Sequence, residues 1–239
     1  MLQEDELANA LKNAKKDGVK EMISCSTSFA SNKKNLLLAK EHLQIKPALG
    51  LYPLDILELS QEELDKAFDF FEAQISSAIA IGEVGLDYKF AKSEEEQKKQ
   101  EEIFFRFIEL AKKYGKPLII HSRYAQTQVL EALQKATAKK VLLHSFVDSA
   151  KLMKTAAELG YFVSAGLSLL YKKDAQENIK TFPLEKLLFE TDSPIRFNGE
   201  KAFPKNIKQI AEKVAEIKSI SVKEVEAQQE KNYLKLFGK

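Results

Sequence analysis

Residues Ala78-Ile79-Ala80-Ile81-Gly82-Glu83 decide the fold, because an apolar run without polar alternation stops there at a carboxylate. A second run, Val141-Leu142-Leu143-His144, has the same form and ends in a histidine. Since no polar residue alternates with the apolar ones, we expect both faces of these strands to be buried, as in barrels and doubly wound parallel sheets. The pattern predicts an α/β fold.

Short apolar runs alternate with longer amphipathic stretches along the chain, which is typical of βα units. The expected strands are Lys20–Ser24, Lys46–Gly50, Ala78–Glu83, Pro117–His121, Lys140–His144, Tyr161–Ser164 and Leu187–Thr191. Ser-x-x-Glu capping boxes predict helix starts at Ser60/Glu63, Ser93/Glu96 and Ser221/Glu224. Helix C-terminal glycines are expected at Gly18, Gly115 and Gly160.

The absence of a G-x-G-x-x-G or Walker-type loop from the sequence favours a TIM (β/α)₈-type barrel over a doubly wound sheet. Such a barrel has eight strands. This chain opens with a predicted helix, Gln3–Lys16, so its first strand is expected to be missing. No repeat, low-complexity tract or linker divides the sequence, and we expect a single domain over residues 1–239.

The charge balance excludes binding of polyanions by bulk electrostatics alone. Lys and Arg number 37 and Asp and Glu 35, for a net charge of +2, so DNA would be held only through a local patch or a metal. The lone Cys25 and an N-terminus without a signal-peptide layout favour a cytoplasmic location. No apolar run approaches the ~18 residues of a membrane span. We expect a monomer with no membrane contact.

Four expected strands end in possible metal ligands, at Glu83, His121, His144 and Asp192. In a parallel barrel the carboxyl ends of all strands meet at one mouth, so these side chains should converge. One histidine at a strand end is more often a hydrogen-bonded core residue, but four such residues together favour a metal site. Two imidazoles and two carboxylates suit Zn²⁺, Mn²⁺ or Mg²⁺. His42 is interpreted as a surface or capping residue.

The flanking sequences closely resemble the TatD family of metal-dependent deoxyribonucleases, within the amidohydrolase-like superfamily. The segments that carry the resemblance are Gly82-Glu83-Val84-Gly85-Leu86-Asp87-Tyr88, Ile120-His121-Ser122-Arg123, Leu143-His144-Ser145-Phe146 and Glu190-Thr191-Asp192-Ser193-Pro194. Each motif is weak alone, but four in this order are specific to the family.

The resemblance implies that Glu83 bridges two metal ions and that His121 and His144 complete one of the two sites. It also implies that Asp192 ligates the other ion and is a candidate to handle the proton of the attacking water. Glu83 and Asp192 are therefore the expected catalytic residues. The family's remaining ligands come from a His-x-His pair on the first strand, and this sequence has no histidine before His42.

Three explanations of the missing pair stay open: a start codon assigned too far downstream, a shortened chain, or a genuine loss of the strand. If the pair is absent, one metal ion rather than two is fully supplied with ligands. Activity would then be weak or lost.

Three residues are expected to contact the substrate: Tyr52, Tyr88 and Arg123. Tyr52 stands where Gly50-Leu51-Tyr52-Pro53 resembles a family segment with a histidine near the scissile phosphate. A tyrosine can donate a hydrogen bond but carries no positive charge at neutral pH. Arg123 can offer a fork of donors to phosphate, or form a surface salt bridge. Tyr88 is expected in a loop at the mouth, where it could stack on a base.

The sequence predicts a metal-dependent hydrolase that cleaves DNA phosphodiester bonds, and the resemblance implies exonucleolytic cleavage. Two alternatives stay open. One keeps the barrel and the metal but changes the substrate to another ester or an amide, since one fold hosts many chemistries. The other is a degenerate, non-catalytic relative that binds nucleic acid or a protein.

Overall fold

The computed structural model describes residues 4–147 and 149–238, which divide into two compact units. One unit is Ile23–His144, and the other combines Met1–Met22 with Ser145–Lys239. The expectation of a single domain over residues 1–239 stays a prediction.

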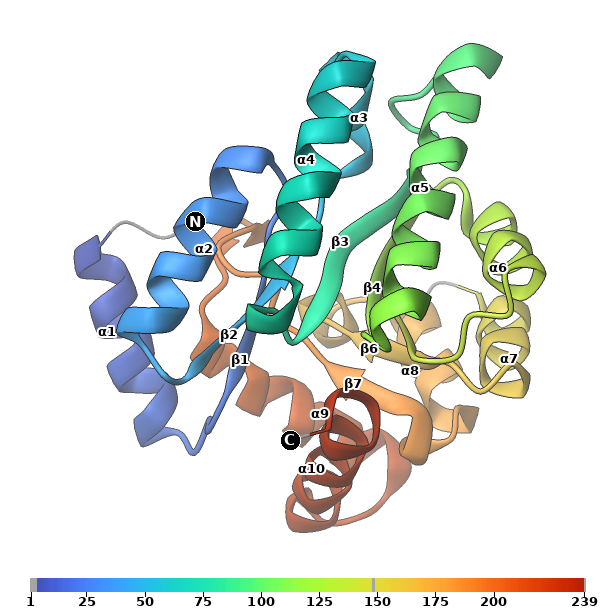
Figure 1. Ribbon diagram of the computed structural model, residues 1–239. Coiled ribbons are helices and arrows are strands. Elements are labelled where there is room, and N and C mark those ends of the chain that lie inside the picture. Colours follow the sequence, from blue (N-terminus) through green and yellow to red (C-terminus); the bar gives the residue numbers. More distant parts are fainter. Residues whose placement is uncertain (1–3, 148, 239) are drawn as a thin grey trace. The chain divides into compact units, whose positions relative to one another are not determined.

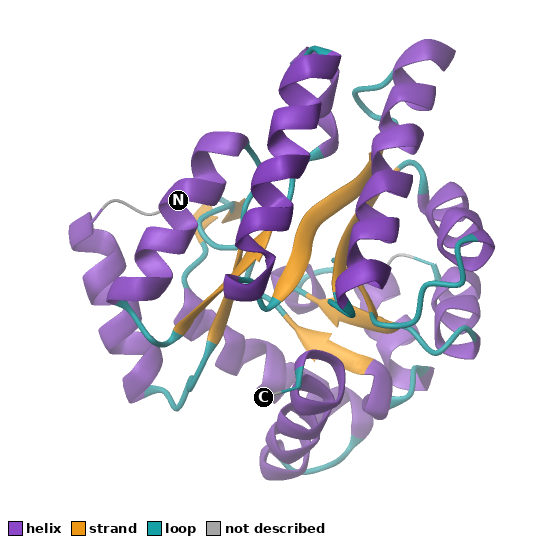
Figure 2. Cartoon of the chain, viewed as in Figure 1, coloured by secondary structure: helices purple, strands orange, loops and turns teal. Residues whose placement is uncertain are grey.

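Parallel strands in chain order form the centre of the Ile23–His144 unit. They are β1 (Met22–Cys25), β2 (Ile45–Leu49), β3 (Ala80–Asp87), β4 (Leu118–Arg123) and β5 (Val141–Leu143). The helices are α2 (Phe29–Glu41), α3 (Pro53–Glu58), α4 (Gln61–Gln74), α5 (Glu94–Tyr114) and α6 (Gln126–Lys135). Figure 1 shows β3 and β4 side by side with α5 packed along them. The predicted strand–helix alternation is confirmed, and Figure 2 shows it by colour.

Strand β3 is longer than the sequence predicts, because it continues past Glu83 to Asp87. Glu83 therefore lies inside the strand rather than at its end, next to an irregularity in the β3–β4 register. The extension depends on Gly85, whose φ is +141°. A Cβ there would lie 2.0 Å from the backbone oxygen of His121, so only glycine lets the two strands approach this closely.

The predicted helix signals are confirmed. The side chains of Ser60, Ser93 and Ser221 each accept a hydrogen bond from the backbone amide three residues on, and each glutamate reaches back to the cap. Gly115 ends α5 in the left-handed conformation, with φ at 64°. These caps fix where α4 and α5 begin and where α5, which packs on β3, ends.

Aromatic packing between α4 and α5 makes a rigid support for the same strands. The ring of Phe107 lies 4.6 Å from that of Phe68 and 5.4 Å from that of Phe71, centre to centre. Phe71, Phe104 and Phe107 are fully buried. Large buried rings contribute strongly to core stability, so the backbone under the site is well fixed.

The second unit contains α1 (Glu4–Lys16) and the parallel pair β6 (Phe162–Ala165) and β7 (Leu187–Phe189). Its other helices are α7 (Ala150–Glu158), α8 (Lys173–Thr181), α9 (Ile207–Lys218) and α10 (Val222–Phe237). Gln3, the expected first residue of α1, lies outside the described residues. An antiparallel hairpin of β8 (Arg196–Phe197) and β9 (Glu200–Lys201) was not predicted.

Within the described part of the chain, no helix is long and apolar enough to cross a bilayer.

Candidate metal centre

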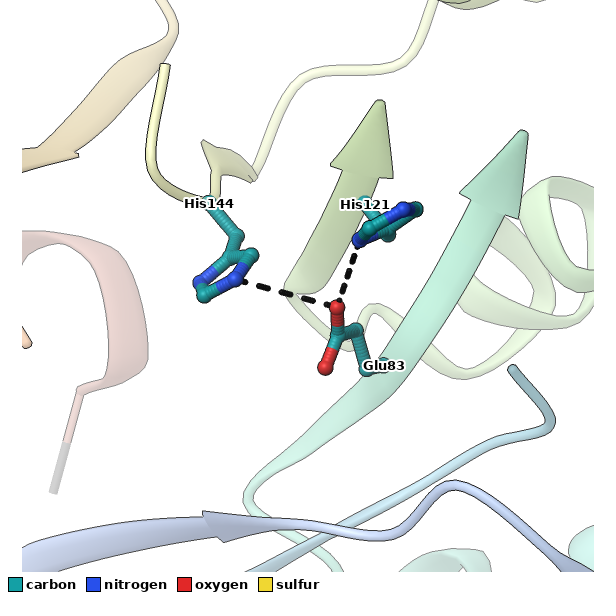
Figure 3. Close-up of side chains that lie close together, drawn as sticks. All are labelled: Glu83, His121 and His144. Carbon is teal, nitrogen blue, oxygen red and sulfur yellow. Dashed lines mark hydrogen bonds and ion pairs between the residues drawn. The ribbon is translucent and has the colours of Figure 1, made fainter. Parts of the chain in front are cut away.

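Three predicted ligands, Glu83, His121 and His144, lie together in the Ile23–His144 unit. Glu83 Oε1 lies 2.9 Å from His121 Nδ1 and 3.8 Å from His144 Nε2. In Figure 3 the carboxylate points from β3 toward both imidazoles. Strands β3 and β4 supply Glu83 and His121, and His144 directly follows β5. The convergence expected from parallel topology thus holds for these three residues.

The exposed fractions of the three side chains are small. Those of Glu83 and His121 are 13% exposed and that of His144 is 15% exposed. The two imidazole rings stack with centroids 6.3 Å apart. A carboxylate so withdrawn from water is costly unless it is paired or holds a cation, which is the situation of a metal ligand.

Asp87 also belongs to this cluster, although the sequence pattern predicted no role for it. Its side chain is fully buried, and Oδ2 lies 3.0 Å from His121 Nε2. The Tyr52 hydroxyl donates to the same oxygen at 2.7 Å, and the Lys89 amide donates to Oδ1 at 3.0 Å. One imidazole nitrogen of His121 thus faces Glu83 while the other faces Asp87. A carboxylate behind a histidine fixes the ring orientation and tautomer of a metal ligand.

Gln100 on α5 holds this arrangement from behind. Its Oε1 accepts from the Asp87 amide at 2.9 Å, and its Nε2 donates to the carbonyl of Pro53 at 3.0 Å. The glutamine is fully buried, so both bonds are shielded from water. It ties the end of β3 to the start of α3, the helix that Tyr52 precedes.

The charges of the cluster stabilise one another. Burial alone would raise the pKa of Glu83, but His144 and His121 hold that pKa below its usual value. Burial likewise raises the pKa of Asp87, and hydrogen bonds from His121 and Tyr52 outweigh it and lower the pKa. Burial alone would lower the pKa of His121, but hydrogen bonds to Asp87 and Glu83 outweigh burial and raise that pKa. Both carboxylates are therefore ionised at neutral pH and can serve as anionic partners.

The donor set fits a divalent cation. One ligand atom from each of Glu83, His121 and His144 lies within 4.8 Å of the other two. Two nitrogens and one carboxylate oxygen, without sulfur, suit borderline and hard cations such as Zn²⁺, Mn²⁺ and Mg²⁺. Three protein ligands leave further positions for water or substrate, as catalytic sites require.

Asp192 lies in the second unit, beyond β7, and is partly exposed. Its φ of 52° is left-handed, which is uncommon for a residue with a side chain. Its carbonyl accepts from the Ile195 amide at 2.9 Å, which closes a tight turn. Strained backbone of this kind is frequent at functional sites. The assignment of Asp192 as a metal ligand stays a prediction.

The three expected substrate residues have different surroundings. Arg123 is exposed at the end of β4, where it can meet a ligand. The Tyr88 hydroxyl donates to Glu101 on α5. Tyr52 is half-buried, and its ring meets that of His121 edge-on at 4.7 Å, so its hydroxyl serves Asp87 and His121. His42, interpreted from the sequence as a surface or capping residue, caps α2 through its backbone amide.

Comparisons with known proteins show the family to which this chain is similar. The sequence model of the family described as "TatD related DNase" matches residues 2–238. The human protein named deoxyribonuclease TATDN3 is 34% identical, over 98% of this chain and 89% of its own. A Bacillus subtilis protein named uncharacterized metal-dependent hydrolase YabD is 29% identical, over 97% of this chain and 92% of its own.

Solved structures share the fold. The TatD homologue YJJV from Escherichia coli superposes with a TM-score of 0.89 at 24% identity, covering 98% of this chain and 93% of that one. A TatD family hydrolase from Entamoeba histolytica gives 0.88 at 21% identity, covering 98% and 90%. The α/β fold of TIM-barrel type predicted from the sequence is confirmed by these likenesses. The family match over residues 2–238 and the 34% identity to the human relative establish that this chain belongs to the TatD-related DNase family of metal-dependent hydrolases.

Proposed function

We propose that this protein hydrolyses DNA phosphodiester bonds, using a divalent cation held by Glu83, His121 and His144. The observation that carries the proposal is the Glu83 carboxylate, buried between the two imidazoles at 2.9 and 3.8 Å. When bound, such a cation supplies Lewis-acid activation of water and of the phosphoryl group. It also supplies local positive charge, which a chain of net charge +2 otherwise lacks for a polyanionic substrate.

The protein's own side chains have separate roles in this proposal. Glu83, His121 and His144 hold the cation, and Asp87 keeps the imidazole of His121 in the ligating orientation. Tyr52 donates to Asp87, and burial followed by that bond raises the pKa of the Tyr52 hydroxyl, which stays protonated as a donor.

Two further residues have proposed roles. The resemblance to the family implies that Asp192 accepts a proton from the attacking water. Arg123, exposed at the end of β4, offers paired donors to a phosphate oxygen.

The direct test is hydrolysis of a 3′-labelled single-stranded oligonucleotide with Mg²⁺, Mn²⁺ or Zn²⁺, each with and without EDTA. We expect cleavage that the chelator abolishes and that Glu83→Gln removes. The matched control is His42→Gln, which changes a histidine outside the cluster and should cleave like the wild type. A folded wild type that holds metal but cleaves no DNA would contradict the proposal.

A panel of small phosphoesters, carboxylic esters and amides, assayed in parallel, tests the alternative substrate. Chelator-sensitive turnover of one of these without DNA cleavage would keep the metal centre and replace the substrate.

A further inference from the structure

The second unit contains a pocket whose lining residues have no role in the proposed hydrolysis. It has a volume of about 310 Å³ and is lined by Ser145, Ser168, Tyr171, Lys172, Phe197 and Asn198. This volume is at the lower end of the roughly 300–1,000 Å³ typical of small-molecule sites. The pocket is therefore large enough for one small planar ligand.

One wall comes from the short helix η2 (Leu167–Leu170) and the turn after it. The carbonyl of Ser168 accepts from the amides of Tyr171, at 3.1 Å, and Lys172, at 2.9 Å. These bonds fix the backbone of both residues while the side chains stay exposed. Tyr171, which is 56% exposed, thus presents its side chain to a ligand from a fixed backbone.

Another part of the lining comes from the β8–β9 hairpin. Asn198 and Gly199 form its two-residue turn with φ of 50° and 85°, the left-handed pair that Asn-Gly sequences favour. The Arg196 side chain donates to the Gly199 carbonyl at 2.9 Å and braces the turn. Phe197, which precedes the turn, is paired with Glu200. A tight hairpin therefore fixes the backbone that carries the second aromatic ring.

Two aromatic rings and one ammonium group around a small pocket match the chemistry of a nucleotide. Bases stack on aromatic faces whatever their sequence, and a lysine contacts the phosphate as a point charge. The hydroxyls of Ser145 and Ser168 and the amide of Asn198 add hydrogen-bonding groups. In the chain, Ser145 directly follows the predicted ligand His144.

We propose that this pocket binds one nucleotide of single-stranded DNA, with its base against Tyr171 and Phe197 and its phosphate at Lys172. The proposal rests on the proposed function for the identity of the polymer. A base must leave its duplex stack before it can enter a pocket of this size, so single strands are preferred over duplexes.

The test measures binding without cleavage. A fluorescein-labelled ten-nucleotide deoxythymidine strand is titrated with protein in EDTA, and fluorescence anisotropy is recorded. Tyr171→Ala should weaken binding roughly tenfold, and Tyr171→Phe, which keeps the ring, should stay within about twofold of the wild type. Lys172→Gln should reduce the slope of log affinity against log salt by about 0.7.

Matched controls separate the pocket from general surface effects. Tyr114→Ala removes an exposed tyrosine that does not line the pocket, and Lys173→Gln removes the neighbouring lysine. Both should bind like the wild type. Wild-type affinity in both Tyr171→Ala and Lys172→Gln, or no binding by the wild type, would overturn the pocket assignment. A blunt duplex whose binding depends equally on Tyr171 would overturn the preference for single strands.

Cleavage with Mn²⁺ is measured separately, so that the two proposals can fail separately. Tyr171-dependent binding by a wild type that cleaves no DNA would uphold the pocket and contradict the proposed function. Cleavage by the wild type with an unchanged KM in Tyr171→Ala would uphold the function and contradict the pocket.

Discussion

The metal centre in one unit and the pocket in the other differ in how deeply their polar side chains are buried. Around Glu83 and Asp87 the charged groups are buried and satisfied by one another. In the pocket, Tyr171 and Lys172 have fixed backbones but exposed side chains. Buried charges that hold one another in a fixed orientation suit a metal ion, which needs a defined ligand geometry. Exposed aromatic rings suit the stacking of bases without sequence preference. Changes in the first region should therefore affect chemistry, and changes in the second should affect substrate affinity.

The largest expected effect comes from Glu83→Gln, which removes the charge between the imidazoles but keeps the shape. Hydrolysis should fall by roughly 100-fold or more, beyond the range for partners outside the ligand shell. Steady-state rates on labelled DNA check this, with circular dichroism to verify folding. Activity in Glu83→Gln equal to that of His42→Gln would show that the buried carboxylate has no part in catalysis.

Asp87→Asn tests whether the orienting carboxylate matters as well as the ligands. Asparagine keeps the volume but removes the charge that faces His121, so metal affinity or activity should fall by about 10- to 100-fold. Isothermal titration with Mn²⁺ measures the affinity. Asp69→Asn, at an exposed site on α4, is the control. An unchanged affinity for Mn²⁺ in Asp87→Asn would remove the orienting role.

Tyr52→Phe gives a smaller effect, because Asp87 keeps its contacts with His121 and the Lys89 amide. Loss of one hydrogen bond to a charged group should lower the affinity for Mn²⁺ by about five- to tenfold. Titration of Tyr114→Phe in parallel gives the baseline. If Tyr52→Phe changes KM for DNA and leaves Mn²⁺ affinity intact, the hydroxyl serves the substrate rather than Asp87.

The smallest effect concerns the cap of α5. Backbone amides of Ser93 and Lys92 hold the pKa of Glu96 below its usual 4.5. A lowered pKa in the folded state means that the stabilisation is present above the unfolded pKa and is lost as pH falls through the folded one. Glu96→Gln should lower Tm by about 1–2 °C at neutral pH. The difference should shrink in acid, and Glu95→Gln, outside the capping bonds, is the comparison. A Tm difference that does not change with pH would contradict the ionised cap.

Much of the metal centre could be predicted from the sequence because neighbouring parallel strands bring their C-terminal halves together. Apolar runs located β3, β4 and β5, and the residues that close or interrupt them are Glu83, His121 and His144. Asp87 was missed because β3 was expected to stop at Glu83. Residues at positions 83, 85 and 87 lie on the same face of an extended strand. This spacing was the signal that could have placed Asp87 beside Glu83.

Contacts between segments that are distant in the sequence could not be predicted from apolar runs or residue spacing. The bond of Tyr52 to Asp87 joins residues 35 positions apart and depends on how α3 packs on α5. The β8–β9 hairpin did carry a signal, since Asn198-Gly199 is a strong two-residue turn sequence. Its two-residue strands are too short to show hydrophobic alternation.

Glu83, His121 and His144 should bind one divalent cation together, and isothermal titration with Mn²⁺ measures that binding. The wild type and His42→Gln should bind with the same affinity. Glu83→Gln, His121→Ala and His144→Ala should each lose that binding while remaining folded. Wild-type affinity for Mn²⁺ in all three variants would contradict the account.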